Sequence, residues 1–422
     1  MAQLKDDCFA FGGELIPLDD ALADLKARIS PVVGTETVST LDAIGRILAE
    51  DVLSARDVPP HDNSAVDGYA VYFEDLHPDQ ETRLPVAGRI AAGHPMQHSP
   101  RRGEAYRIFT GAPMPEGEDG GPDTIYMEED CQRDGDTVIL PAGLQAGSNR
   151  RKRGEDVKAG DIVLRRGSRL RAQEIGMAAS VGRAELQVFE KLKVAVFSTG
   201  DEICDPSGVA AAGRIFDSNR YSTQAQLREL GCSVTDIGIL PDNQALIAEA
   251  LGKAARDHHL LITSGGVSAG EEDHVKAAVE SQGTINLWRL AIKPGRPIAL
   301  GQVGHTAFIG LPGNPVAAMV TFMTIARGVI LMLSGAAESM AQRYRVEIGF
   351  DHRKKLGRRE WVRVRLKRGP QNHLTAHKIH SGGSGILTSL VDADGLVELG
   401  EEIEAVKAGD QVGFLPFNEV VR

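Results

Sequence analysis

Residues 260–266 read LLITSGG, a short apolar run that ends in a glycine-rich turn. The same pattern occurs in VAVFSTGDE over 194–202 and in AFIGLPGNP over 307–315. Such runs are typical of buried parallel strands, whose carboxyl ends meet at one edge of a sheet. Glycine lets backbone N–H groups approach a ligand, and a helix after the turn adds partial positive charge. The turns therefore predict an anion site, and the carboxylates beside two of them suggest a metal ion there.

Strand and helix patterns alternate from Lys193 onward, which predicts a parallel sheet covered on both faces, with ligands at the carboxyl ends of its strands. The strands are expected over 194–197, 234–240, 260–263 and 307–309. The helices are expected over 221–230 and 243–255, after Asp273, and over 316–333, with Asn314-Pro315 capping and opening the last one.

The flanking segments predict further domains. Apolar residues at helical spacing indicate helices over 18–29, begun by Asp19 or Asp20, and over 41–49 and 172–181. Short apolar runs between Gly/Pro-rich turns indicate β structure over 69–140 and after residue 335. We expect an α/β multidomain protein with a discontinuous helical domain (1–60 and 150–190), a β-rich insertion (61–149), a central α/β domain (191–335) and a C-terminal β-barrel-like domain (336–422).

Composition favours a soluble protein that binds a small anion. The 422 residues are 42% hydrophobic and 25% charged with net charge −11, which argues against a general nucleic-acid binder. No apolar stretch is expected to approach the ~20 residues that span a bilayer, and the first eleven residues lack the apolar core of a signal peptide. Four widely spaced cysteines suggest reduced thiols in a cytoplasm. Basic residues cluster in 353–368 and 150–153. Each cluster could form part of an anion site or could be a solvated surface.

Further segments match one family in order along the chain. They are DNSAVDGYA (62–70), TGAP (110–113), RKRGED (151–156), IFDSNR (215–220) and LAIKPGRP (290–297). Together with the three turns, they closely resemble the molybdopterin molybdenumtransferase family (MoeA, and the E domain of gephyrin). The similarity runs from about residue 15 to about residue 418.

The resemblance implies the last step of molybdenum cofactor synthesis. The family takes molybdate and adenylyl-molybdopterin, cleaves the phosphoanhydride, releases AMP and leaves molybdenum on the dithiolene. It is cytosolic in bacteria, depends on a divalent metal, and forms an elongated four-domain homodimer whose active cleft is shared between subunits. Transient partners would be molybdopterin adenylyltransferase and recipient molybdoenzymes, with no nucleic acid and no membrane.

Within the α/β domain, acidic residues at strand ends are candidates for Mg²⁺, which binds a few carboxylates together with water and phosphate oxygens. We expect Asp201, Glu202 and Asp273 to hold the metal, helped by Asp242. The alternative for Glu202 and Asp273 is a role at a helix N-terminus, and Asp242 could be a plain turn residue.

Three polar residues outside that domain match family positions associated with activity. Asp67 is expected to orient the attacking group or a metal-bound water, unless it is only a turn residue before Gly68. Asp156 and Thr110 are expected at the same cleft, Thr110 as a hydrogen-bond donor.

Anion contacts are expected from the turns and from cationic side chains. The turn residues are Ser198, Gly200, Ser264, Gly265, Gly266, Ser268, Pro312, Gly313, Asn314 and Pro315. Lys293 and Arg296 would hold molybdate or phosphates, and Arg358, Arg363 and Ser384 would bring further contacts from the C-terminal domain. The alternative is that half of these arginines keep a β surface soluble.

Two other functions remain open. One is molybdopterin adenylyltransferase, which has a similar α/β domain but whose known forms need only that domain. The other is a non-catalytic molybdopterin-binding scaffold, against which the presence of Asp67, Glu202, Asp242 and Asp273 argues.

Overall fold

The computed structural model describes residues 15–117, 120–266, 274–295, 297–369, 373–379 and 383–420. The chain divides into two compact units, which we describe separately. The main unit holds residues 1–50, 166–171 and 186–422, and the β-rich unit holds residues 51–165 and 172–185. The predicted four-domain boundaries stay a prediction.

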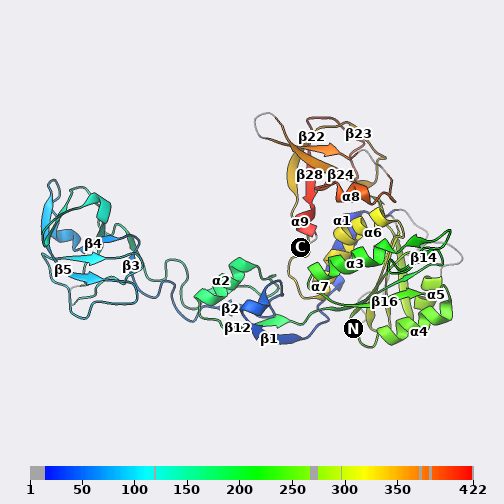
Figure 1. Ribbon diagram of the computed structural model, residues 1–422, viewed down its shortest axis with the longest axis horizontal. Helices are drawn as coiled ribbons and strands as arrows, with labels where there is room; N and C mark the ends of the chain where they lie inside the picture. The colour runs from blue at the N-terminus through cyan, green and yellow to red at the C-terminus, as the bar shows by residue number, and fades with distance from the viewer. Residues whose placement is uncertain are drawn as a thin grey trace. The chain divides into compact units, whose positions relative to one another are not determined.

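A six-stranded sheet forms the centre of the main unit (Figure 1). Its strands, in spatial order, are β16 (Ser233–Leu240), β13 (Lys193–Thr199), β17 (Leu260–Ser264), β21 (Thr306–Leu311), β20 (Pro297–Val303) and β18 (Gly283–Arg289). The first four are parallel, as predicted, and β20 and β18 continue the sheet antiparallel. Only residues 304 and 305 separate β20 from β21, too few for the crossover that a parallel connection needs.

Helices cover both faces of this sheet, as predicted. Alternate β13 residues enter different cores: Val194 and Val196 enter one, Ala195 and Phe197 the other. The first core contains residues of α3 (Ser218–Glu229), α6 (Pro315–Thr321) and α7 (Arg327–Leu333), and the second contains residues of α4 (Gln244–Ala254) and α5 (His274–Glu280). The register of β13, β17 and β21 places the ends of all three glycine-rich runs at one sheet edge.

One helix corrects the expectation about apolar stretches. Among the described residues, Pro315–Leu333 is long and apolar enough to cross a membrane by length and composition alone. Its 19 residues comprise α6, a π-helical turn (η4, Phe322–Ala326) and α7, and 89% of its apolar window is buried inside the protein. It therefore has the burial of a core helix. Pro315 opens it as predicted, whereas the Asn314 side chain makes no capping bond.

The N-terminal segment contains one predicted helix and lacks another. Helix α1 (Leu18–Arg28) follows Pro17, and Asp19 in its first turn bonds Arg359 instead of capping. The helix expected over 41–49 is wrong: only a 3-10 turn, η1 (Leu41–Ala43), forms. Gly45 has φ +74°, outside the helical region, and its N–H donates to the Leu170 carbonyl. Strands β1 (Thr35–Ser39) and β12 (Glu185–Phe189) pair nearby.

The C-terminal region forms the predicted barrel. Strands β24 (Arg359–Arg368), β25 (Leu374–Lys378), β22 (Tyr344–Ile348), β28 (Gln411–Pro416) and β26 (Gly395–Leu399) pair in that order, and β26 pairs with β24 to close the ring. The short strand β19 (Ile292–Lys293) adds to β24 and places Lys293 opposite Glu360. The main unit also contains β14 (Ile203–Cys204) paired with β15 (Ile215–Phe216), β23 (His352–Arg353) paired with β27 (Ala405–Val406), α8 (Thr388–Val391) and α9 (Phe417–Val420).

The β-rich unit is a six-stranded sheet with short additions, which confirms the β structure expected over 69–140. Its strand order is β7 (Thr124–Met127), β4 (Gly68–Val71), β6 (Ala105–Ile108), β5 (Thr82–Ile90), β9 (Thr137–Leu140) and β8 (Gln132–Asp134). The additions are η2 (Phe73–Asp75), η3 (Glu128–Asp130), the pairs β2 (Val52–Leu53) with β11 (Ile162–Leu164) and β3 (Asn63–Ser64) with β10 (Arg150–Arg151), and the predicted helix α2 (Ala172–Ser180).

Candidate active site

A cavity of about 770 Å³ lies in the main unit between the sheet edge and the barrel. The site residues predicted from the sequence that line it are Glu202, Gly265, Gly266, Lys293, Pro312, Gly313, Asn314, Arg358, Arg363 and Ser384. Lining residues that the sequence reasoning missed are Ile292, Pro294, Gly295, Val316, Ala317, His352, Glu360, Trp361, Val362, Lys378 and Ile379. The cavity therefore combines turn backbone with a polar wall from the barrel.

The second and third turns meet because β17 and β21 are neighbours. The Gly265 N–H donates to the Leu311 carbonyl at 3.0 Å, and a Cβ on Gly313 would lie 3.6 Å from the Gly265 Cα. Gly266 has φ +64°, and a Cβ there would lie 2.7 Å from Val275 Cγ2. Glycine is required at 266 by both backbone conformation and space.

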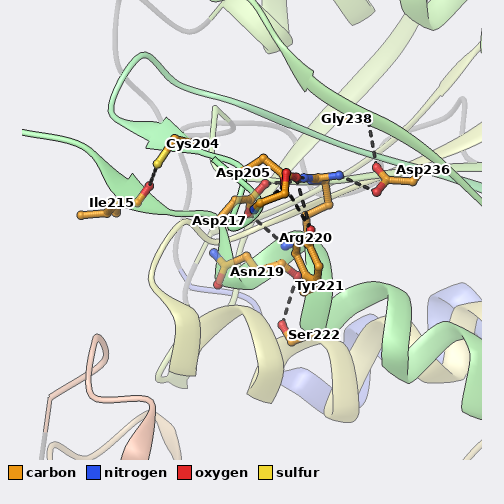
Figure 2. A network of polar contacts seen from close by, with 11 residues as sticks. Cys204, Asp205, Ile215, Asp217, Asn219, Arg220, Tyr221, Ser222, Asp236 and Gly238 are labelled. Atoms are coloured by element: carbon orange, nitrogen blue, oxygen red, sulfur yellow. Dashed lines mark hydrogen bonds and ion pairs between the residues drawn. The ribbon is translucent and has the colours of Figure 1, made fainter. Parts of the chain in front are cut away.

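The third turn is also held by two hydrogen bonds from other segments. The Asn219 amide donates to the Gly313 carbonyl at 2.7 Å, and the Val316 N–H donates to the Ser384 carbonyl at 3.0 Å. Asn219 lies in the first turn of α3, next to an ion-pair cluster in which the buried Arg220 bonds Asp205, Asp217 and Asp236 (Figure 2). This cluster anchors the start of α3, and thereby Asn219, against the third turn.

The first turn contributes one carboxylate to the cavity. Gly200 has φ +135°, and a Cβ built on it would lie 2.6 Å from Glu202 Oε2, so that the carboxylate lies over the glycine. Ser198 is fully buried, whereas Asp201 and Asp242 are exposed and do not line the cavity. Ser264 is buried at the end of β17, and Pro315 begins α6 beside Asn314.

The metal set cannot be assembled from the described residues alone. Asp273, Ser268 and Arg296 lie outside them. Within the ranges that the structure describes, no group of three or more His, Cys, Asp or Glu side chains could hold a metal ion. Of the expected set, Glu202 is placed at the cavity.

A chain of polar contacts forms the barrel wall of the cavity. Lys293 Nζ donates to Glu360 Oε1 at 3.0 Å, and His352 Nε2 lies 3.2 Å from the same oxygen. His352 Nδ1 lies 3.1 Å from Lys378 Nζ. Burial, followed by the nearby Lys378 charge, lowers the pKa of His352, so the imidazole is neutral near pH 7.

Ion pairs within the main unit neutralise part of the basic stretch 353–368. Arg359 bonds Asp19 and Glu401, and these contacts raise its pKa further above the usual arginine value despite the opposing effect of burial. Arg363 donates to the Gly383 carbonyl at 3.0 Å and to Ser389 Oγ at 2.8 Å. Among the described residues, no ion pair joins the Arg358 or Arg363 guanidinium to a carboxylate, and both side chains line the cavity. These two cations remain able to meet an anion.

The β-rich unit joins two of the remaining predicted residues. The Thr110 N–H and Oγ1 donate to Asp67 Oδ1 at 2.7 and 2.8 Å. These two bonds lower the pKa of Asp67, with a smaller contribution from the Arg107 charge. A Cβ on Gly68 would lie 1.7 Å from the Tyr126 carbonyl oxygen, so glycine is required beside Asp67. Asp156 is exposed, and its N–H donates to the Val58 carbonyl.

The residues of the barrel wall that were not predicted differ in whether a sequence pattern marks them. Glu360 is the acid of the Arg-x-acid-aromatic-x-Arg pattern over 358–363, so its position could have been singled out. His352 and Lys378 come from separate strands, and no local pattern marks either residue. The closed barrel brings them to one wall.

Comparison with known proteins now adds to this geometry. Three family models match in order: the MoeA N-terminal region (domain I and II) over residues 16–182, a probable molybdopterin binding domain over 195–331, and the MoeA C-terminal region (domain IV) over 345–417. The structure of the molybdopterin biosynthesis moeA protein from Pyrococcus horikoshii superposes with a TM-score of 0.80 at 28% identity, covering 96% of this chain and all of that one. The fold is thus that of a MoeA-type protein.

Sequence relatives give the family. The molybdopterin molybdenumtransferase of Haemophilus influenzae is 37% identical over 409 residues, covering 96% of this chain and 100% of the relative. That of a Nostoc species is 34% identical, covering 90% of this chain and 88% of the relative. The chain belongs to the molybdopterin molybdenumtransferase family.

Proposed function

We propose that this protein is a molybdenum insertase. It transfers molybdate to the dithiolene of adenylyl-molybdopterin, cleaves the phosphoanhydride with the help of Mg²⁺ and releases AMP. The observation that carries this proposal is the cavity, which is lined by Gly265, Gly266 and Gly313, by cationic side chains and by the first-turn carboxylate of Glu202. Relatives over nearly the whole chain are named for the same transfer.

The cavity suits a ligand with several anionic groups. Lys293, Arg358, Arg363 and Lys378 line it, against the carboxylates of Glu202 and Glu360. Backbone N–H groups of glycine turns and the start of the Pro315–Leu333 helix favour phosphate and other oxyanions. Arginine and lysine add charge-assisted hydrogen bonds to such oxyanions. The volume of about 770 Å³ is within the range of sites for drug-sized ligands.

The donor chemistry fits a Mg²⁺ ion shared with the substrate. Mg²⁺ sites commonly use one or two carboxylates and complete the shell with phosphate oxygens and water. Glu202 offers such a carboxylate at the cavity, and we propose that Asp201 and Asp273 complete the metal-holding set, helped by Asp242. When bound, the ion would neutralise charge on the oxygens of the cleaved linkage.

The β-rich unit supplies an ionised carboxylate. Asp67 is an exposed carboxylate, and the two hydrogen bonds that Thr110 donates to it lower its pKa. We propose that it orients the attacking group, with Asp156 at the same cleft, and that the β-rich unit of one subunit serves the cavity of the other in a homodimer. Light scattering that gives a single 45.2 kDa species would contradict the dimer. We also propose a cytoplasmic location, with molybdopterin adenylyltransferase and recipient molybdoenzymes as transient partners.

A turnover assay tests the function. Purified protein is incubated with adenylyl-molybdopterin, Mg²⁺ and molybdate, and AMP is measured. An insertase releases AMP in a molybdate-dependent manner. An adenylyltransferase instead consumes ATP and unmodified molybdopterin, and a scaffold binds adenylyl-molybdopterin without turnover. Either of the last two results would replace the proposal.

A further inference from the structure

The barrel wall of the cavity contains a four-residue chain of contacts that joins four strands, β19, β23, β24 and β25. Glu360, on β24, is only 7% exposed and is the shared acceptor of this chain. Its Oε1 receives Lys293 Nζ at 3.0 Å and faces His352 Nε2 at 3.2 Å. The parallel pairing of Lys293 with Glu360 fixes the first contact through the backbone.

The far end of the chain decides where the imidazole carries its proton. Lys378 Nζ lies 3.1 Å from His352 Nδ1, and an ammonium group can only donate hydrogen bonds. Nδ1 must therefore accept, and the ring proton sits on Nε2, from which it is donated to Glu360. The arrangement defines one tautomer and one direction for every bond, from Lys378 through His352 to Glu360.

Among the residues that the structure describes, this chain of contacts gives one of its two ammonium groups, that of Lys378, no carboxylate partner. Glu360 neutralises the Lys293 charge at 3.0 Å. Lys378 contacts a neutral imidazole, which aims the ammonium without cancelling its charge. Both lysines line the cavity, and a tetrahedral dianion is best met by more than one cationic donor.

We propose that Lys378 is a ligand residue for the tetrahedral oxyanion, acting together with Lys293, and that His352 and Glu360 are positioning residues that hold the two ammonium groups. This inference rests on the proposed function, because it takes molybdate as the oxyanion that the cavity receives. The inference adds Lys378, His352 and Glu360 to the site. Of these three residues, Glu360 alone lies in a local sequence motif, the arginine-flanked pattern over 358–363.

The first experiment measures oxyanion affinity without the pterin. Full-length protein is titrated with molybdate by isothermal titration calorimetry, for wild type, Lys378→Ala and Lys367→Ala. Lys367 is exposed on β24 and does not line the cavity, so its variant controls for the loss of one positive charge. Lys378→Ala is expected to raise Kd about tenfold, the size of a lost hydrogen bond to a charged group, and Lys367→Ala to leave it unchanged.

The second experiment tests positioning through a double-mutant cycle. His352→Ala is expected to raise the molybdate Kd by less than Lys378→Ala. If His352 acts through Lys378, the double variant binds molybdate no more weakly than Lys378→Ala alone. A purely structural role for His352 would instead give additive losses. In the turnover assay, these substitutions should raise the KM for molybdate more than they lower kcat.

The outcomes separate this inference from the proposed function. If wild type releases AMP and Lys378→Ala has unchanged Kd and KM for molybdate, the ligand role of Lys378 is wrong and the proposed function stands. If wild type releases no AMP but Lys378→Ala still weakens molybdate binding, the function is wrong and the oxyanion site stands. Equal losses in Lys367→Ala and Lys378→Ala, no molybdate binding by wild type, or full additivity in the cycle would each overturn the inference.

Discussion

The two units of this protein carry polar groups of different kinds. In the main unit, side chains from residue 202 to residue 384 surround a cavity of about 770 Å³, and the backbone of two glycine turns forms part of its wall. In the β-rich unit, one exposed carboxylate, Asp67, is bonded by a single residue, Thr110. The first arrangement can enclose a ligand, whereas the second presents a single carboxylate to its surroundings.

This difference suggests a division of work. A cavity with several cations and amides supplies binding energy, and changes in it should affect the affinity for oxyanion or metal. We propose that the single carboxylate of Asp67 orients the reacting atoms, so that changes in it should affect kcat. The following substitutions test whether binding depends on the main unit and orientation on the β-rich unit.

The largest effect is expected from Glu202→Gln in the main unit. Gln keeps the shape but removes the charge that we propose holds Mg²⁺, so AMP release should fall about 10³-fold, with folding unchanged. The rate is measured over a Mg²⁺ titration with circular dichroism as the folding check. Glu249→Gln, on the exposed surface of α4, is the control. A wild-type rate in Glu202→Gln would remove the metal assignment.

Next in size is a stability effect confined to the main unit. Arg220 is 4% exposed and bonds Asp205, Asp217 and Asp236 (Figure 2). Arg220→Met leaves the equally buried Asp217 without its counterion, which should lower the free energy of unfolding by about 3–5 kcal/mol. Urea denaturation checks this value.

The exposed Arg256 provides the control for that substitution, since Arg256→Met should change stability by less than about 0.5 kcal/mol. If the β-rich unit unfolds in a separate transition, only the transition of the main unit should move in Arg220→Met. An unchanged denaturation midpoint would show that the three carboxylates are adequately solvated without the guanidinium.

The third-largest effect is expected from a substitution of Asp67 in the β-rich unit. Asp67→Asn keeps both Thr110 contacts possible but removes the charge, and we expect kcat for AMP release to fall about 10²-fold, with little change in the KM for molybdate. Asp79→Asn, in an exposed loop of the same unit, is the control. A loss that falls on KM instead of kcat would break the division between binding and orientation.

Features of the fold and the site that depend on neighbouring residues in the sequence could be predicted, and features that depend on contacts between distant segments could not. The glycine turns are local patterns, so the strands before them and the parallel core of the sheet were predictable. The apolar residues over 41–49 have helical spacing, so the pattern predicted a helix there. The left-handed backbone conformation of Gly45 prevents that helix. The antiparallel edge follows from the two-residue connection before β21, a hairpin signal that the strand–helix rhythm concealed.

The barrel wall was the least predictable part of the site. The register of β19 on β24 brings Lys293 to Glu360, and the pairing of β24 with β25 brings Lys378 to the same sheet, whereas His352 lies on β23, which pairs with β27. A register shift of one residue would turn these side chains to the opposite face, and no single segment encodes the register. The Asp67–Thr110 contact likewise joins the segments before β4 and after β6, and only the resemblance placed the two residues in one cleft.

The smallest expected effect comes from Thr110→Val, which removes the Oγ1 bond to Asp67 and keeps the backbone one. Thr110 lowers the pKa of Asp67 in the folded protein, so its stabilisation is present above the unfolded pKa and lost as pH falls through the folded value. The variant should raise the pKa of Asp67 toward its usual value. Near pH 7 the carboxyl stays ionised, so AMP release should fall less than about tenfold.

A pH–rate profile provides the measurement. If the ionised form of Asp67 is required, the acid limb of kcat should move to higher pH in Thr110→Val, while Glu202→Gln lowers the rate at every pH. An acid limb that does not move would mean that Asp67 does not set the acid limb of kcat. The β-rich unit would then contribute a hydrogen-bonded surface and not an ionised group, and the contrast between the two units would lose its chemical basis.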